Sequence, residues 1–100
     1  MKTTFKEEGN DYVMYFEGRL DTASAPQVQQ DVQPLIDNPD HDIILDCSQL
    51  DYISSSGLRI FLFILKDAKA KGNHVFIRSL NDSLRQVFTM TGFISLFEFK

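Results

Sequence analysis

The beginning of the chain alternates apolar and polar residues with the two-residue period of β-strands. Two such runs, Thr3 to Glu8 and Tyr12 to Glu17, flank Gly9-Asn10, a pair that is typical of hairpin turns. In the second run, both sets of alternating positions carry apolar side chains, so neither face of that strand is suited to solvent. We therefore expect a hairpin whose second strand lies in the interior of the sheet.

Helical spacing begins after the hairpin. Apolar residues recur every three or four positions from Val28 to Ile36, which predicts an amphipathic helix. Thr22 or Ser24 is suited to cap its N-terminus, and Pro26 is suited to its first turn. The helix is expected to end at Asn38-Pro39-Asp40.

The middle of the chain combines a buried strand with a strongly apolar helix. The run from Asp42 to Cys47 is almost continuously apolar, which favours a strand of a parallel pair, and Leu50 to Ile53 continues towards the sheet. Ser54-Ser55-Ser56-Gly57 then opens a helix from Leu58 to about Ala70, and Gly72-Asn73 is typical of a C-terminal cap. The core face of this helix is expected to carry Leu58, Phe61, Leu62, Leu65 and Ala68.

The last third of the chain predicts two strands around a third helix. His74 to Arg78 forms the first strand, Asn81 or Asp82 caps the helix, Gly92 ends it, and Ile94 to Phe99 supplies the last strand. The core face of the helix is expected to carry Leu84, Val87, Phe88 and Thr91.

The predicted element order is therefore β-β-α-β-α-β-α-β. Strands that alternate with helices favour an α/β fold with one mixed sheet, helices packed against it and right-handed crossovers. A chain of 100 residues is suited to one hydrophobic core, so we expect a single domain over residues 1–100.

Composition narrows the classes of function. Ten basic and fourteen acidic residues give a net charge of -4, which argues against a nucleic-acid partner. Cys47 is the one cysteine, so a disulfide framework and a cysteine-rich zinc site are excluded. The longest apolar run, Ile60 to Leu65, is far below the roughly 20 residues of a membrane-spanning helix, and the N-terminus lacks the apolar core of a signal peptide. We expect a cytoplasmic protein without direct membrane binding.

The serines before the apolar helix are the most informative segment. The first turn of a helix has unpaired N–H groups and a positive dipole end, so it tolerates a phosphate or another anion. Ser54 is suited to cap the helix, which leaves Ser55 and Ser56 in its first turn, with Arg59 one turn beyond Ser55. Serines at this position also occur simply as caps.

The same helix is more apolar than one core face requires. Ile60, Phe63 and Ile64 lie outside the predicted core stripe. Such residues are typical either of a helix that binds a partner or of a helix enclosed by its own protein. The sequence leaves both alternatives open.

Catalytic motifs are weak or missing. The serine segment lacks the first glycine of a Gly-x-Ser-x-Gly nucleophile elbow, and a serine nucleophile would depend on His41 or His74, neither of which lies in a recognisable motif. The two histidines are too far apart for a metal-binding pair, and phosphate-binding glycine loops are absent. Asp82-Ser83-Leu84 matches an acyl-carrier attachment motif, but helix capping explains it. We therefore expect that the protein is not an enzyme and that it binds no metal and no cofactor.

Four segments together resemble the STAS domain family, and within it the bacterial anti-sigma factor antagonists. They are Gly18 to Asp21, Ile43 to Cys47 followed by Leu50 to Ile53, Ser55 to Leu58, and Val87 to Phe93. The order and spacing of these segments carry the resemblance, which covers essentially the whole chain.

The resemblance implies a phosphorylation switch. The family's phosphorylatable serine corresponds to Ser55, with Ser54 or Ser56 as second choices, because Ser54 stands where the family has an aspartate. It implies an anti-sigma factor that is also a serine kinase, which holds its own ATP and Mg²⁺, and a PP2C-type phosphatase that resets the switch. The protein alone is expected to be a monomer. The expected partner-binding residues are Asp21, Ser54, Ser55, Ser56, Gly57, Arg59 and Phe63.

A second function is compatible with the same family. The chain would then be a cytoplasmic STAS subunit of an ABC-type lipid transport complex. In that case the serine helix would be a docking surface and phosphorylation would play no part.

Overall fold

The computed structural model describes residues 1–37 and 40–100, and within them a mixed five-stranded sheet has the order β1-β2-β3-β4-β5. Strand β1 (Lys2–Glu8) pairs antiparallel with β2 (Asp11–Leu20). The remaining strands, β3 (Asp42–Ile53), β4 (Val75–Arg78) and β5 (Glu98–Phe99), follow in parallel pairs. The predicted fold class and the interior position of the second strand are confirmed.

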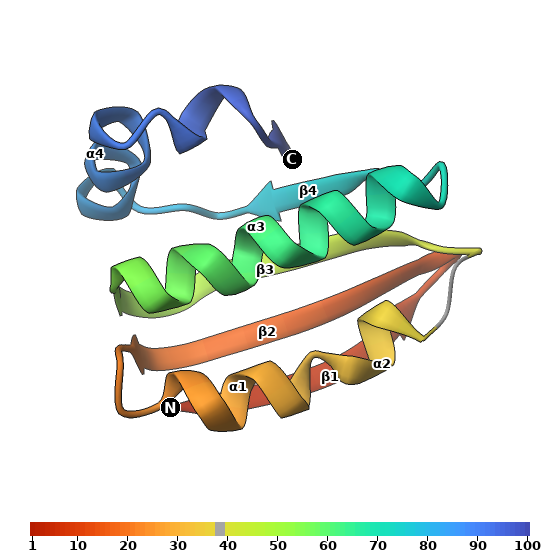
Figure 1. Cartoon of the computed structure of the whole chain (residues 1–100), viewed down its shortest axis with the longest axis horizontal. Coiled ribbons are helices and arrows are strands. Elements are labelled where there is room, and N and C mark those ends of the chain that lie inside the picture. The colour runs from red at the N-terminus through yellow and green to blue at the C-terminus, as the bar shows by residue number, and fades with distance from the viewer. Residues whose placement is uncertain (38–39) are drawn as a thin grey trace.

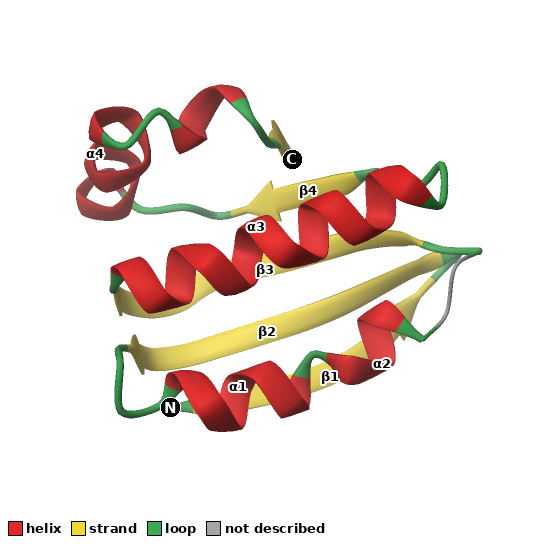
Figure 2. Cartoon of the chain, viewed as in Figure 1, coloured by secondary structure: helices red, strands yellow, loops and turns green. Residues whose placement is uncertain are grey.

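The helices lie over one face of this sheet. Helices α1 (Ala25–Asp31), α2 (Gln33–Ile36) and α3 (Ser55–Ala70) pass in front of the strands, and α4 (Asp82–Met90) lies near one end (Figure 1). A short 3₁₀ turn, η1 (Phe93–Ser95), connects α4 to β5 (Figure 2). Crossover helices on a parallel sheet bury the apolar strands beneath them.

The core between sheet and helices centres on Phe61 of α3, which is fully buried. Its ring lies 5.2 Å from that of Phe16 in β2, 6.3 Å from that of Phe88 in α4 and 6.5 Å from that of Phe97. Tilted and edge-on contacts at these distances are favourable for aromatic rings. One side chain thus joins the sheet, α3, α4 and the C-terminal segment.

The predicted first helix is divided in two. Helix α1 ends before Val32 and α2 begins at Gln33, because Pro34 has no N–H to donate to the carbonyl of Gln30. The N–H of Leu35 donates instead to the carbonyl of Val32, at 2.9 Å. Residues 38 and 39, where the sequence predicts that the helix ends at Asn38-Pro39-Asp40, lie outside the described residues.

The predicted C-terminal strand is also shorter than expected. Instead of a strand over 94–99, the chain forms η1 and then β5, which is two residues long. The 3₁₀ turn directs Phe93 edge-on towards Phe88, with ring centroids 6.5 Å apart. The prediction for Thr91 is wrong as well, because its side chain is exposed and its hydroxyl donates to the carbonyl of Val87 at 2.8 Å.

The apolar side chains outside the predicted core stripe of α3 differ in how far they are buried. Ile60 and Ile64 are buried, at 4% and 0% exposure, since α1 and α2 lie alongside α3. Phe63 remains 45% exposed. For the two isoleucines the enclosed-helix alternative is therefore correct, and Phe63 is left as the candidate for contact with a partner. None of the helices in the described part of the chain is long and apolar enough to cross a membrane.

Candidate functional site

The carboxyl ends of β2 and β3 meet at one edge of the sheet. Leu20 and Ile53 are paired in the parallel register, and the N–H of Ser54 donates to the carbonyl of Leu20 at 2.8 Å. This bond places the loop after β2, which begins with Asp21, beside the N-terminus of α3. In open α/β sheets, this is the edge at which functional residues usually gather. We call Asp21, Ser54, Ser55 and Ser56 the serine edge.

Ser54 caps α3 as predicted. Its backbone is extended, and its side-chain oxygen accepts a hydrogen bond from the N–H of Gly57 at 3.3 Å. Ser55 is the first helical residue and its side chain is exposed, whereas Ser54 and Ser56 are half-buried. The three serines are therefore not equivalent. One acts as a cap, and Ser55 presents its hydroxyl to solvent.

Gly57 is buried and allows α3 to lie close to the strand ends. A Cβ atom at this position would lie 2.7 Å from Cγ of Leu20 and 2.8 Å from Cγ1 of Ile53, closer than carbon atoms can approach. The absence of a side chain therefore sets the position of the first turn of α3. Gly57 therefore lies below the predicted partner-binding surface, and the neighbouring residues form the surface itself.

Asp21 and Ser24 close the loop after β2 by a reciprocal pair of hydrogen bonds. Oδ1 of Asp21 accepts from the N–H of Ser24 at 2.9 Å, and Oγ of Ser24 accepts from the N–H of Asp21 at 3.0 Å. The hydrogen bond from the Ser24 backbone, and then that from its hydroxyl, hold the pKa of Asp21 below its ordinary value. Of the two predicted cap residues, Thr22 and Ser24, it is Ser24 that occupies the N-cap position of α1, but its side chain accepts no hydrogen bond from the helix. Its hydroxyl instead lies within hydrogen-bond distance of the carbonyls of Arg19 and Asp21.

A cation–aromatic pair adjoins the serine edge and was not predicted from the sequence. Arg19 and Tyr52 are partners in the register of β2 and β3, and the guanidinium carbon of Arg19 lies 4.3 Å from the centre of the Tyr52 ring. Both side chains are exposed. The pair depends on which residues face each other across β2 and β3, so the local sequence around Arg19 or around Tyr52 does not predict it.

A shallow groove of about 640 Å³ runs between α1 and α3 beside the serine edge. It brings together three of the predicted partner-binding residues: Ser56, Arg59 and Phe63. Asp21 does not line it, although the next residue, Thr22, does. The remaining lining residues are Ala25, Pro26, Gln29 and Ile60. We call this feature the α1–α3 groove.

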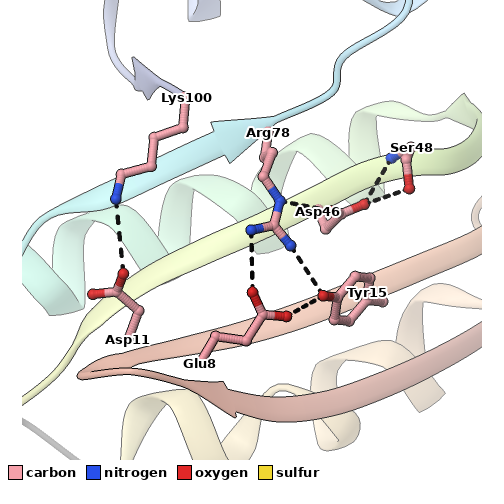
Figure 3. Close-up of polar contacts among 7 residues, drawn as sticks. All are labelled: Glu8, Asp11, Tyr15, Asp46, Ser48, Arg78 and Lys100. Atoms are coloured by element: carbon pink, nitrogen blue, oxygen red, sulfur yellow. Dashed lines mark hydrogen bonds and ion pairs between the residues drawn. The ribbon is translucent and has the colours of Figure 1, made fainter.

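A second polar cluster covers the sheet face opposite α3 (Figure 3). Arg78 of β4 lies at its centre, and its Nε donates to Oδ2 of Asp46 at 2.7 Å. One terminal nitrogen of Arg78 donates to Oε1 of Glu8 at 3.3 Å, and the other donates to the hydroxyl of Tyr15 at 3.0 Å. The Tyr15 hydroxyl also donates to Glu8, and Ser48 donates twice to Oδ1 of Asp46. We call these five residues the Arg78 network.

The Arg78 network connects four strands and covers apolar side chains. Val13 and Ile44 lie two positions before Tyr15 and Asp46 in β2 and β3, so they point to the same face, and they are 0% and 3% exposed. No helix crosses this face within the described residues (Figure 1). The aliphatic parts of long polar side chains can shield such residues from water.

The charges of the network stabilise one another. Burial alone would raise the pKa of Asp46, but the hydrogen bonds from Ser48 and Arg78 outweigh it and keep this pKa below its ordinary value. The hydrogen bond from Tyr15 is the largest influence that lowers the pKa of Glu8. All three charged groups, Glu8, Asp46 and Arg78, are therefore ionised at neutral pH.

The geometry argues against nucleophilic catalysis at the serines. His41 and His74 directly precede β3 and β4, at the amino ends of parallel strands, whereas the serine edge lies at the carboxyl ends. Cys47 is fully buried, and this burial raises the pKa of its thiol to about 12. Within the residues described, no three His, Cys, Asp or Glu side chains come together to hold a metal ion.

Comparison with known proteins decides the family. The STAS domain model matches residues 2–100. The chain belongs to the STAS domain family. This agrees with the resemblance inferred from the four sequence segments, two of which, Gly18 to Asp21 and Ser55 to Leu58, contribute to the serine edge.

Individual relatives agree with this assignment. BtrV of Bordetella bronchiseptica is 30% identical over 97 residues, which cover 97% of this chain and 84% of BtrV. The anti-sigma-B factor antagonist of Bacillus subtilis is 28% identical over 87 residues, which cover 87% of this chain and 79% of the relative. Among solved structures, the phosphorylated form of the Bacillus cell fate determinant SpoIIAA has a TM-score of 0.74 at 18% identity, with coverage of 99% and 91%. Its unphosphorylated form has a TM-score of 0.71 at 19% identity, with coverage of 88% and 82%.

Proposed function

We propose that this protein is an anti-sigma factor antagonist that binds an anti-sigma factor and so releases a sigma factor, and that phosphorylation of Ser55 ends this binding. The name of the Bacillus subtilis relative and the two forms of SpoIIAA support the proposal. In this role the protein is a cytoplasmic binding module and not an enzyme. Its anti-sigma factor is also a serine kinase, and a PP2C-type phosphatase reverses the modification.

The single observation that carries the proposal is the exposure of Ser55 in the first turn of α3. A kinase can reach this hydroxyl without unfolding the domain. Ser54 uses its side-chain oxygen to accept from Gly57, and Ser56 is half-buried, so both are less suited to accept a phosphoryl group. The geometry therefore favours the serine that corresponds to the family's phosphorylation site.

A phosphate at this position leaves the fold intact and changes the surface. The kinase transfers the γ-phosphoryl group of its own ATP to Oγ of Ser55, the hydroxyl proton passes to a base of the kinase, and ADP is released. The product carries about -1.5 to -2 additional charges at neutral pH. The positive end of α3 stabilises that charge locally. At an interface, however, the phosphate must be desolvated, which weakens partner binding.

The test uses the intact protein and the purified serine-kinase-type anti-sigma factors encoded by its source organism, with Mg²⁺ and ATP. We expect one phosphoryl group per chain by mass spectrometry, located on Ser55. Ser55→Ala should lose the label. Ser83→Ala is the matched control, because Ser83 is also an exposed serine in the first turn of a helix, α4, and it should be labelled like wild type.

Two results would overturn the proposal. The first is full labelling of Ser55→Ala, which would place the modification elsewhere. The second is the absence of labelling by any of the kinases. Stable purification of the protein with a permease and an ATPase would then favour the transporter subunit.

A further inference from the structure

Among the described residues that line the α1–α3 groove, Arg59 is the only charged one. Its side chain is exposed, and within the described residues it takes part in no ion pair. Two neighbouring acidic side chains are engaged elsewhere: Asp67, further along α3, pairs with Lys71 at 3.0 Å, and Asp21, across the serine edge, accepts from Ser24. The groove therefore presents one unpaired positive charge.

Arg59 also lies one helical turn after Ser55. Residues four positions apart in a helix are neighbours on its surface, and opposite charges in this arrangement attract each other. A guanidinium group can bind a phosphate through two parallel hydrogen bonds. A phosphate on Ser55 would thus have a ready partner within the same helix.

We propose that Arg59 binds an acidic side chain of the partner when Ser55 is unmodified, and that a phosphate on Ser55 withdraws Arg59 from the partner by pairing with it. The inference rests on the proposed function and adds a mechanism for the switch. The phosphate acts on the interface twice, by adding negative charge and by neutralising the cation that the partner uses.

The groove also indicates the rest of the partner's chemistry. Phe63 is 45% exposed at the groove, next to the buried Ile60, and both lie within one turn of Arg59. A large apolar surface beside a lone cation fits a segment with an apolar side chain next to a carboxylate. Phenylalanine and arginine are both enriched at protein interfaces relative to the rest of the protein surface.

The first experiment measures the pairing without a partner or a kinase. Phosphoserine is incorporated at position 55 during translation, and the second phosphate pKa is measured by ³¹P NMR. The attraction of Arg59 should make this pKa about 0.3 unit lower in the protein with Arg59 than in the Arg59→Gln variant. Lys66→Gln is the control, because Lys66 is an exposed cation on the same face of α3 that does not line the groove. Equal values in the protein with Arg59 and in Arg59→Gln would overturn the proposed pairing.

The second experiment measures the affinity of unmodified and phosphorylated protein for the anti-sigma factor that phosphorylates it. Arg59→Gln should weaken binding of the unmodified protein about tenfold, and Lys66→Gln less than twofold. The loss of affinity on phosphorylation should be about twofold smaller in Arg59→Gln than in wild type, because a pairing of about 0.3 pKa unit corresponds to a factor of about two in affinity. An unchanged ratio would overturn the competition for Arg59.

The two proposals can fail separately. If no kinase labels Ser55, the proposed function fails, and the NMR experiment still decides whether Arg59 pairs with a phosphate at this position. If Ser55 is labelled but Arg59→Gln behaves like wild type in both experiments, the switch is real and the role given to Arg59 is wrong.

Discussion

The Arg78 network and the serine edge are both polar clusters on the same sheet, but they differ in how their groups are paired. In the network, the guanidinium of Arg78 donates to three different side chains, and Asp46 is only 5% exposed. At the serine edge, Ser55 is exposed, and the neighbouring Arg59 has no ion pair within the described residues. The polar groups of the network are paired within the protein, whereas the serine edge and Arg59 leave an exposed hydroxyl and, among the described residues, an unpaired cation at the surface.

The two clusters differ in what their polar groups can do: those of the network stabilise the sheet, and those of the serine edge are, under the proposed function, available to a partner. Buried polar groups must be paired, because an unpaired buried charge costs several kcal/mol. The network meets this requirement and holds four strands together. Exposed groups at the serine edge are hydrated in the free protein, so they can remain unpaired without such a cost. Substitutions in the network should therefore change stability, and those at the serine edge should change binding.

The largest expected effect is that of Arg78→Met. This change leaves the carboxylate of Asp46 buried without its ion pair, and we expect it to lower the free energy of unfolding by about 3 kcal/mol. Arg59→Gln at the α1–α3 groove should change it by less than about 0.5 kcal/mol. Urea unfolding followed by circular dichroism measures both. The double variant Asp46→Leu with Arg78→Met should recover most of the loss, and a loss below about 1 kcal/mol for Arg78→Met alone would contradict the distinction between the clusters.

The pH dependence of stability is the second way to test the network. The folded-state pKa of Asp46 is lowered, because the hydrogen bonds from Ser48 and Arg78 outweigh burial. Its ionised form therefore contributes stability at pH values above its unfolded pKa of roughly 3.9, and this contribution is lost as pH falls through the lower folded pKa. Wild type should be more stable than Asp46→Asn by a constant amount above about pH 5, and the two should converge in acid. Parallel curves in acid would contradict the pairing.

A third effect of intermediate size concerns the packing beneath the serine edge. Gly57→Ala introduces a methyl group 2.7 Å from Leu20 and 2.8 Å from Ile53, so the backbone of α3 must shift. We expect a loss of about 1–2 kcal/mol in the free energy of unfolding, although alanine is the better helix former. Ser56→Ala in the same turn is the control and should have little effect. A gain in stability for Gly57→Ala would show that α3 tolerates a shift.

Much of the fold follows from local sequence patterns. The hairpin, the interior position of β2, the parallel strand β3 and the cap Ser54 were predicted, and Asn81 was one of the two residues predicted to cap α4, since each depends on periodicity or capping within a few residues. The break between α1 and α2 could also have been predicted, because Pro34 removes a helical hydrogen bond. The 3₁₀ turn before β5 depends on the contact of Phe93 with the core, which no local pattern reveals.

For the candidate site, too, the features that depend on local sequence patterns were predicted, and those that depend on distant contacts were not. The exposure of Ser55 follows from its place after a helix cap, and its carboxyl-edge position follows from the strand that precedes it. The Arg78 network was not predicted, because Glu8 and Arg78 are 70 positions apart and the sheet order alone brings them together. The burial of Ile60 depends in the same way on where α1 and α2 pack against α3.

The smallest expected effects separate two adjacent serines. Ser54→Ala removes the hydroxyl that accepts from Gly57, so it should lower the free energy of unfolding by about 1 kcal/mol, and Ser54→Asp should restore the cap. Ser55→Ala should change stability by less than about 0.3 kcal/mol, because its exposed hydroxyl caps no helix N–H, yet it should abolish labelling by the kinase. Thermal or urea unfolding of the three variants measures the first contrast. Equal destabilisation by Ser54→Ala and Ser55→Ala would mean that the hydroxyl of Ser55 also supports the fold, and the serine edge would then resemble the Arg78 network more closely than its exposure indicates.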